Sequence, residues 1–295
     1  MRRILLFLGT NLAVLVLLTI VSHLLGVDAW AAARGYGGLG PLLVFAAVIG
    51  MGGSFISLAM SKWMARTMTG ARVIERPSSE VEQWLVSSVR QHAQAAGIGM
   101  PEVAVYEAPE MNAFATGASR NHALVAVSTG LLHGMNRDQV AAVLGHEIGH
   151  VANGDMVTLA LIQGVLNTFV IFLARVVGQV VDGWLSGDRD SRGGGLGYFM
   201  VVIVLEIVFG LFASMIVMAF SRYREFRADA AGARLAGRER MISALQRLAA
   251  SYGESTLPKT MQTFGISGHL SGGFRRLFMS HPPLGERIEA LRRAA

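Results

Sequence analysis

The chain has 295 residues, of which 52% are hydrophobic and only 16% charged, and its mean hydropathy is +0.46. This composition excludes an ordinary soluble protein and indicates a chain that lies in a lipid bilayer. The net charge of +6 comes from basic residues at the ends of apolar segments, which favours anionic lipid over nucleic acid as a partner. The chain has no cysteine, so any metal ion must be held by His, Asp or Glu.

Four apolar stretches are each long enough to cross about 30 Å of hydrocarbon as a helix. They comprise residues 4–25, 37–60, 156–181 and 196–220. The first could instead be a cleavable signal peptide, because Arg2 and Arg3 precede it and several alanines follow it. Its length is greater than that of a typical signal core, so we expect a retained helix.

Short segments rich in Lys and Arg resist translocation and therefore predict orientation. Such segments precede the first stretch and follow the second and the fourth, whereas the opposite loops are nearly neutral. Both termini are therefore expected in the cytoplasm. The expected organisation is two transmembrane helices (1–60), a first cytoplasmic segment (61–155), a transmembrane hairpin (156–220) and a second cytoplasmic segment (221–295).

The sequence of the first cytoplasmic segment predicts two helices that flank a small antiparallel sheet. Ser79 and Glu82 have capping-box spacing at the start of a helix over residues 78–97. Asn136 and Gln139 have the same spacing at the start of a second helix. Apolar or alternating runs between turn residues predict strands at 102–107, 112–117 and 123–128.

The sequence HEIGH, residues 146–150, lies on the second of these helices. His146 and His150 are four residues apart, so their rings project from one face and can hold a single ion. Glu147 is rotated off that face, where it can reach a water molecule beside the ion. This HExxH arrangement is typical of two zinc ligands and a general base. Gly145 and Gly149 would let neighbouring elements approach this helix closely.

A catalytic zinc site needs a third protein ligand and an open position for water. Glu225 is the best candidate, because a transmembrane hairpin returns the chain to the surface that it left after His150. Asp229 lies one helical turn further on, where it could accept a hydrogen bond from a ligating imidazole. The alternative is an ordinary charged helix in which both carboxylates balance neighbouring arginines.

HEIGH, a hydrophobic hairpin, EFRAD and a C-terminal SHPPLGERI together resemble the HtpX-type membrane-embedded zinc metalloproteases. That family includes the CAAX prenyl endoprotease and the mitochondrial Oma protease. The resemblance covers essentially the whole chain, including the MNAFATG segment. It implies a mainly helical membrane protein that carries a cytoplasmic α+β, zincin-like (gluzincin) protease domain.

The resemblance also implies residue roles. One Zn²⁺ per chain would be held by His146, His150 and Glu225, with Glu147 as general base. Asp229 would support a ligand, and His281 would donate a hydrogen bond near the reacting carbonyl. The substrate-binding strand would contain Asn112, Ala113 and Phe114. From the residues alone, Asn112 could be a turn residue and His281 a helix-start residue. Arg287 could support this region or lie on the surface beside Glu286.

The expected function is a zinc endopeptidase of the bacterial cytoplasmic (inner) membrane that cleaves misfolded or damaged membrane proteins and unfolded polypeptides during stress. Two alternatives remain at this stage, a CAAX-type prenyl-protein endoprotease and a non-catalytic membrane scaffold or transporter. Polar residues within the apolar stretches favour the transporter, since a charge within a membrane is usually functional. Arg175 and Glu206 could instead form a structural pair across the hairpin.

Overall fold

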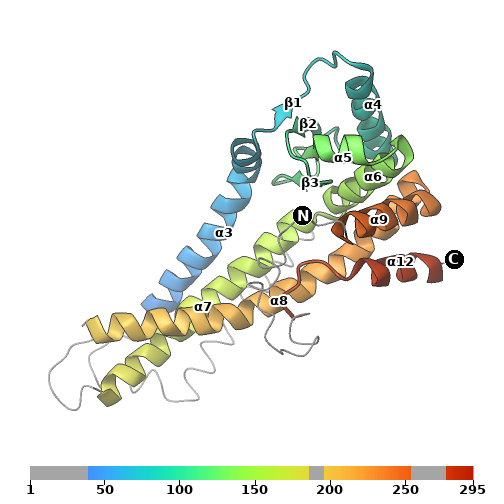
Figure 1. The fold of residues 1–295 in the computed structure, drawn as a ribbon. Coiled ribbons are helices and arrows are strands. Elements are labelled where there is room, and N and C mark those ends of the chain that lie inside the picture. Colours follow the sequence, from blue (N-terminus) through green and yellow to red (C-terminus); the bar gives the residue numbers. More distant parts are fainter. Residues whose placement is uncertain (1–38, 186–195, 254–276, 295) are drawn as a thin grey trace. The chain divides into compact units, whose positions relative to one another are not determined.

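The computed structural model describes residues 39–185, 196–253 and 277–294 (Figure 1). The chain divides into two compact units. One comprises the residues through Ser57 together with Ala160–Val217, and the other comprises Leu58–Leu159 and Met218–Ala295. Each unit is therefore built from two separate parts of the sequence.

Three long helices in the described residues are apolar and long enough to cross a membrane. They are α3 (Leu39–Thr69), α7 (Asp155–Leu185) and α8 (Leu196–Ala236), and they cover the second, third and fourth predicted spans. The first predicted span, residues 4–25, lies outside the described residues. α8 has 41 residues, a length of about 60 Å at a rise of roughly 1.5 Å per residue. The EFRAD segment therefore continues the same helix as the last span.

Small residues let α3 and α7 approach closely within the first unit. A Cβ atom at Gly50 would lie 2.5 Å from the backbone nitrogen of Thr168. The predicted pair between α7 and α8 is confirmed, because Arg175 Nη1 lies 2.6 Å from Glu206 Oε1. The Arg175 guanidinium also lies 5.2 Å from the centre of the Phe45 ring. The pairing gives both charged groups a structural reason to lie within apolar helices.

The second unit contains a four-stranded sheet with the order β1-β2-β4-β3. Its strands are β1 (Arg72–Val73), β2 (Glu102–Tyr106), β3 (Ala113–Thr116) and β4 (Leu124–Ser128). The expectation of a purely antiparallel sheet was wrong, because β2 and β4 pair in parallel while β3 pairs antiparallel with β4. Alternation of side chains defines the faces of a strand but does not reveal its direction relative to a neighbour. β4 is buried along its whole length, which suits its central position.

Five helices complete the described part of this unit. They are α4 (Glu80–Ala95), α5 (Thr129–Gly134), α6 (Arg137–Asn153), α9 (Arg238–Gly253) and α12 (Leu284–Arg293). The predicted capping box of Asn136 and Gln139 is present at the start of α6. Ser79 caps α4, but the Glu82 carboxylate accepts hydrogen bonds from Ser78 rather than from the Ser79 backbone, so that box is only half formed.

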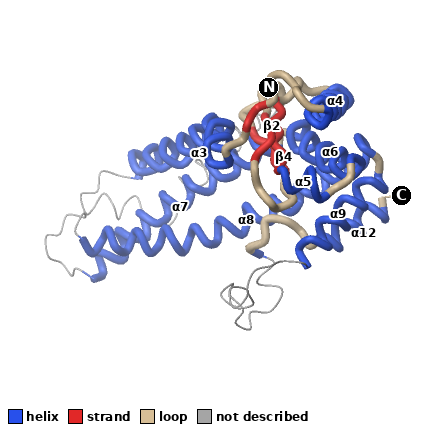
Figure 2. The backbone as a smooth tube through the Cα atoms, turned by 45° about the horizontal axis from the view of Figure 1, so that its top comes forward, coloured by secondary structure: helices blue, strands red, loops and turns tan. Residues whose placement is uncertain are grey.

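The sheet has a buried core on each face. Val125 and Val127 of β4 face a large cluster to which α4, α5, α6 and α9 contribute, and Leu144 lies within this cluster. Leu124 faces a smaller cluster on the other side, which includes Tyr106. Figure 2 shows the strands beside α4, α5 and α6. This packing fixes α6, which carries the HEIGH sequence, against the sheet.

Candidate active site

The HEIGH sequence lies in the buried second half of α6. His146 and His150 are each 7% exposed, and their Nε2 atoms lie 3.1 Å apart. This short distance means that both rings face a common point, as the four-residue spacing predicts. It also means that the two Nε2 atoms cannot both carry a proton directed at the other.

Glu225 reaches the same point from α8 and is only 1% exposed. Its carboxylate oxygens lie 3.5 Å from His146 Nε2 and 3.3 Å from His150 Nε2. One ligand atom from each of the three residues lies within 4.8 Å of the others. The structure thus brings together residues that are 75 positions apart in the sequence.

Glycine residues allow α6 and α8 to lie this close. A Cβ atom at Gly145 would lie 3.2 Å from Gly232 Cα, and one at Gly149 would lie 2.7 Å from the Cβ of Ala231. A Cβ atom at Gly232 would lie 3.1 Å from the backbone nitrogen of His146. The predicted close approach at Gly145 and Gly149 is confirmed, and a larger side chain there would push Glu225 away from the imidazoles.

Each imidazole is oriented by a buried carboxylate. His146 Nδ1 lies 2.9 Å from Asp229 Oδ1, and His150 Nδ1 lies 2.8 Å from Asp155 Oδ2. A proton on Nδ1 is donated to the carboxylate in each case, which leaves the Nε2 lone pair free for an ion. The role of Asp155 is not predicted by the sequence. Only the turn at Gly154, which ends α6 with a φ of 65°, brings Asp155 back towards His150.

Arg287 of α12 is buried at 6% exposure and belongs to the same network. It donates two hydrogen bonds to Asp229, at 2.8 and 2.6 Å, and its Nη1 lies 3.3 Å from Glu225 Oε2. Of the two alternatives for Arg287, the structure therefore favours support of the site over a surface position. Such a two-point contact holds the Asp229 carboxylate in one orientation.

Charge pairing shifts the pKa values of this network. Burial disfavours the charged form of His146, but contacts with Asp229 and Glu225 outweigh it and raise the pKa to about 9. Burial likewise opposes ionisation of Glu225, but contacts with His146 and His150 outweigh it and hold its pKa well below the usual range. The pKa of Asp229 is also lowered, because Arg287 and His146 outweigh the effect of burial. The carboxylates are therefore ionised at neutral pH.

These groups fit a metal ion. Both oxygens of Glu225 are buried, and their ion-pair contacts do not have regular hydrogen-bond geometry. A buried, ionised carboxylate without regular hydrogen bonds is costly. A cation between Glu225 and the two Nε2 atoms would remove that cost, so the donor set is that of a metal site.

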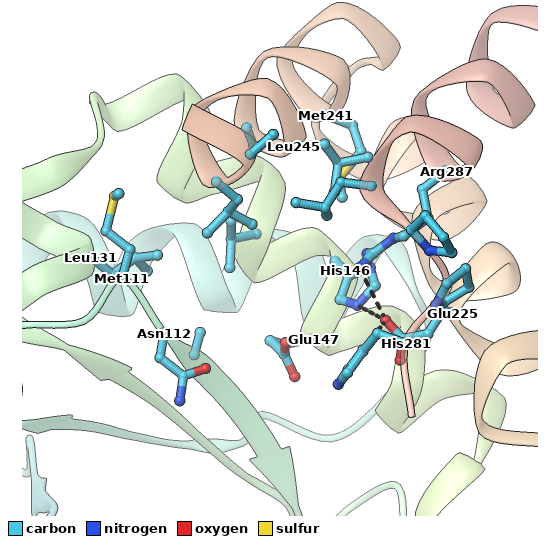
Figure 3. A pocket seen from close by; sticks show the side chains of 18 of the residues that line it. Met111, Asn112, Leu131, His146, Glu147, Glu225, Met241, Leu245, His281 and Arg287 are labelled. Atoms are coloured by element: carbon cyan, nitrogen blue, oxygen red, sulfur yellow. Dashed lines mark hydrogen bonds and ion pairs between the residues drawn. The ribbon is translucent and has the colours of Figure 1, made fainter. Parts of the chain in front are cut away.

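A cavity of about 460 Å³ opens beside the cluster, and its lining includes Glu147, His281, Asn112 and Ala113 (Figure 3). Glu147, only 9% exposed, points into it between His146 and Asn112. The His281 side chain, 60% exposed, places Nδ1 at 3.0 Å from Glu225 Oε2. His281 therefore contacts a candidate ligand directly while its ring stays accessible from the cavity.

The strand with the predicted substrate-binding residues lies at the edge of the sheet, paired within the described residues only with β4. Asn112 precedes β3; its backbone N–H donates to Ser128 Oγ, and its carbonyl accepts a hydrogen bond from the Ser128 N–H. Asn112 and Ala113 line the cavity. Phe114 does not, because its ring packs 5.6 Å from the Tyr106 ring in the core on the opposite face.

Three comparisons relate the chain to known proteins. Residues 79–295 match the model of peptidase family M48. The chain is 64% identical over 290 residues to Protease HtpX of Stenotrophomonas maltophilia, covering 98% of this chain and 97% of that protein. It is also 64% identical over 294 residues to Protease HtpX of Xanthomonas euvesicatoria pv. vesicatoria, covering 100% and 98%. The crystal structure of S. mikatae Ste24p shares the fold, with a TM-score of 0.60 at 17% identity, covering 97% of this chain and 67% of that chain.

Proposed function

The chain belongs to peptidase family M48 and is a membrane metalloprotease, and we propose that His146, His150 and Glu225 hold its catalytic metal ion while Glu147 acts as general base. The observation that carries this proposal is the convergence of two imidazoles and a buried carboxylate beside a cavity that also contains Glu147. Family membership favours this enzyme over the scaffold and transporter alternatives.

Zinc is the proposed ion, at one per chain. The two Nε2 atoms lie 3.1 Å apart, and the Glu225 carboxylate faces both of them, with Oε2 at 3.5 Å from His146 and Oε1 at 3.3 Å from His150. Two histidines and one glutamate, with a position left for water, form a known catalytic ligand set for this ion. When bound, zinc would polarise the scissile carbonyl and make a water molecule more acidic.

The protein side chains would carry the proton transfers. Glu147 accepts the proton of the attacking water and then delivers it to the leaving nitrogen. Asp229 and Asp155 hold the imidazole rings in place during this exchange, and Arg287 keeps Asp229 ionised and oriented. His281 would donate a hydrogen bond to the carbonyl oxygen, since its ring is accessible at the cavity.

The substrate chain would lie extended along β3. The free edge of a strand offers main-chain hydrogen bonds that do not depend on the sequence of the bound peptide. Asn112 and Ala113 line the cavity beside this edge, so a peptide paired there would pass in front of Glu147. Phe114 would support the strand from the opposite face rather than contact substrate.

The setting we propose is the bacterial cytoplasmic membrane, with the site and both termini on the cytoplasmic side. Support for the orientation comes from the Lys and Arg residues at the ends of the apolar helices. The substrates would be misfolded or damaged membrane proteins and unfolded polypeptides. A CAAX-type activity is the rival, and cleavage of a prenylated peptide in preference to unfolded chains would favour it.

Glu147→Gln tests the mechanism in the full chain, purified in detergent and loaded with zinc. The variant should retain zinc but cleave an unfolded protein on the order of 10²-fold more slowly or worse, because the general base is lost. Glu239→Gln, at an exposed position of α9, is the matched control and should cleave at the parent rate. Equal rates for the parent and Glu147→Gln would refute the assignment.

A further inference from the structure

The cavity beside Glu147 continues into a region that we call the apolar lobe (Figure 3). Its lining side chains are Met111, Leu131, Val143, Met241, Leu245 and Leu248. Among the described lining residues, Asn112 is the only polar one besides His146, Glu147, Glu225, His281 and Arg287. The cavity therefore has a reactive, charged end and an uncharged end.

Apart from Met111, which precedes β3, the side chains named for the apolar lobe come from helices α5, α6 and α9. Met241, Leu245 and Leu248 recur at helical spacing on one face of α9. Val143 lies one helical turn before Glu147 on α6, so the two side chains project on the same side of that helix. The position of Val143 relative to Glu147 is thus set by a single helix.

Burial changes along the lobe. Leu131 and Leu245 are 1% and 0% exposed, whereas Leu248 is partly exposed and Ala249, which also lines the cavity, is exposed. The lobe is therefore open to solvent at one end and buried at the other. Water held against such walls finds few hydrogen-bond partners, so an entering apolar group would displace it favourably.

We propose that the apolar lobe is a substrate subsite that selects a large apolar side chain, such as Leu, Met or Phe, at one of the two residues that flank the scissile bond. This inference rests on the proposed function, because it takes Glu147 to lie beside the attacked carbonyl. A charged side chain in the lobe would lose its hydration without gaining a partner. Leu, Met and Phe side chains are normally buried in folded proteins and exposed in unfolded ones, so this subsite would direct cleavage to unfolded chains.

The cleavage pattern provides the first test. The zinc-loaded full chain in detergent would digest unfolded casein, and mass spectrometry would identify the cleaved bonds. Large apolar residues should be enriched at one flanking position only. In peptides that differ only there, Leu should give a kcat/KM roughly 10- to 200-fold above that of Ala or Asp, the range by which hydrophobic pockets discriminate.

Two variants test whether the lobe causes the preference. Ala249→Leu narrows the opening and should shift cleavage towards Ala and Gly, whereas Val143→Ala widens the interior and should shift it towards Phe and Trp. Ala250→Leu is the matched control, since it makes the same change at an exposed neighbour that does not line the cavity. It should leave the parent pattern unchanged.

The outcomes separate this inference from the function on which it rests. Metal-dependent cleavage that is lost in Glu147→Gln, but shows no apolar enrichment or the same pattern in all three variants, would overturn the subsite alone. No cleavage by the zinc-loaded parent would instead overturn the proposed function. Should Val143→Ala fail to fold, Ala249→Leu decides the matter at an exposed position.

Discussion

Gly149→Ala should weaken metal binding although the new methyl group touches none of the candidate ligands. The added Cβ would lie 2.7 Å from the Cβ of Ala231, whereas an ordinary contact begins near 3.4 Å, so α6 and α8 must separate by about 0.7 Å. Because α6 carries the histidines and α8 carries Glu225, this separation lengthens ligand contacts that now span 3.3–3.5 Å.

Overpacking of this kind costs about 1–3 kcal/mol, and each 1.4 kcal/mol corresponds to roughly a tenfold change in affinity. We therefore expect zinc affinity, measured by chelator competition on the full chain in detergent, to fall by about 5- to 150-fold. Ala231→Gly in the same chain should restore most of the loss, because the nearest remaining atom is Ala228 O at 3.2 Å.

Gly285→Ala is the matched control, because a Cβ atom there meets nothing within 4 Å. It should leave zinc affinity unchanged and raise the thermal midpoint slightly. Parent-like affinity in Gly149→Ala, or no recovery in the double variant, would refute the account of helix approach.

Three further predictions concern charged groups. Asp229→Asn should reduce zinc affinity about 10- to 100-fold, because the carboxylate that orients His146 is lost. Titration with a competing chelator measures this affinity, and a value equal to that of the parent would contradict the prediction. The pKa of His146 is raised from 6.5 to about 9, so the metal-free chain should lose stability as the pH rises through 9 and the protonated ring loses its charge. Thermal midpoints measured in the presence of a chelator between pH 6 and 10 would show this loss of stability, and a midpoint that does not change with pH would contradict it. Glu206→Leu should lower the thermal midpoint in detergent because it leaves Arg175 unpaired, and adding Arg175→Leu should reverse this; additive losses would exclude the pair.

The fold was predictable where a simple sequence feature marks an element. The length of the apolar stretches identified α3, α7 and α8, and the capping-box spacing of Asn136 and Gln139 marked the start of α6. The sheet direction was not predictable, because parallel pairing of β2 with β4 depends on how the chain crosses between them. β1 has only two residues, too few to show any alternation.

The convergence of the candidate ligands was predictable where they share a helix or follow a hairpin. HEIGH gives two imidazoles by spacing alone, and Glu225 follows from the return of the hairpin. Arg287 gave no comparable signal, because it lies 58 positions beyond Asp229 and its burial depends on tertiary packing. Asp155 depends on the left-handed turn at Gly154, which a spacing rule for helices does not describe.

The most direct test of the central claim is the zinc content of the purified chain, compared between the parent and Glu225→Ala. The parent should hold one zinc ion per chain, and Glu239→Ala, at an exposed position of α9, should hold the same amount. Glu225→Ala should lose most of its zinc after dialysis, because only two protein ligands remain. Equal zinc in all three proteins would contradict a metal site completed by α8.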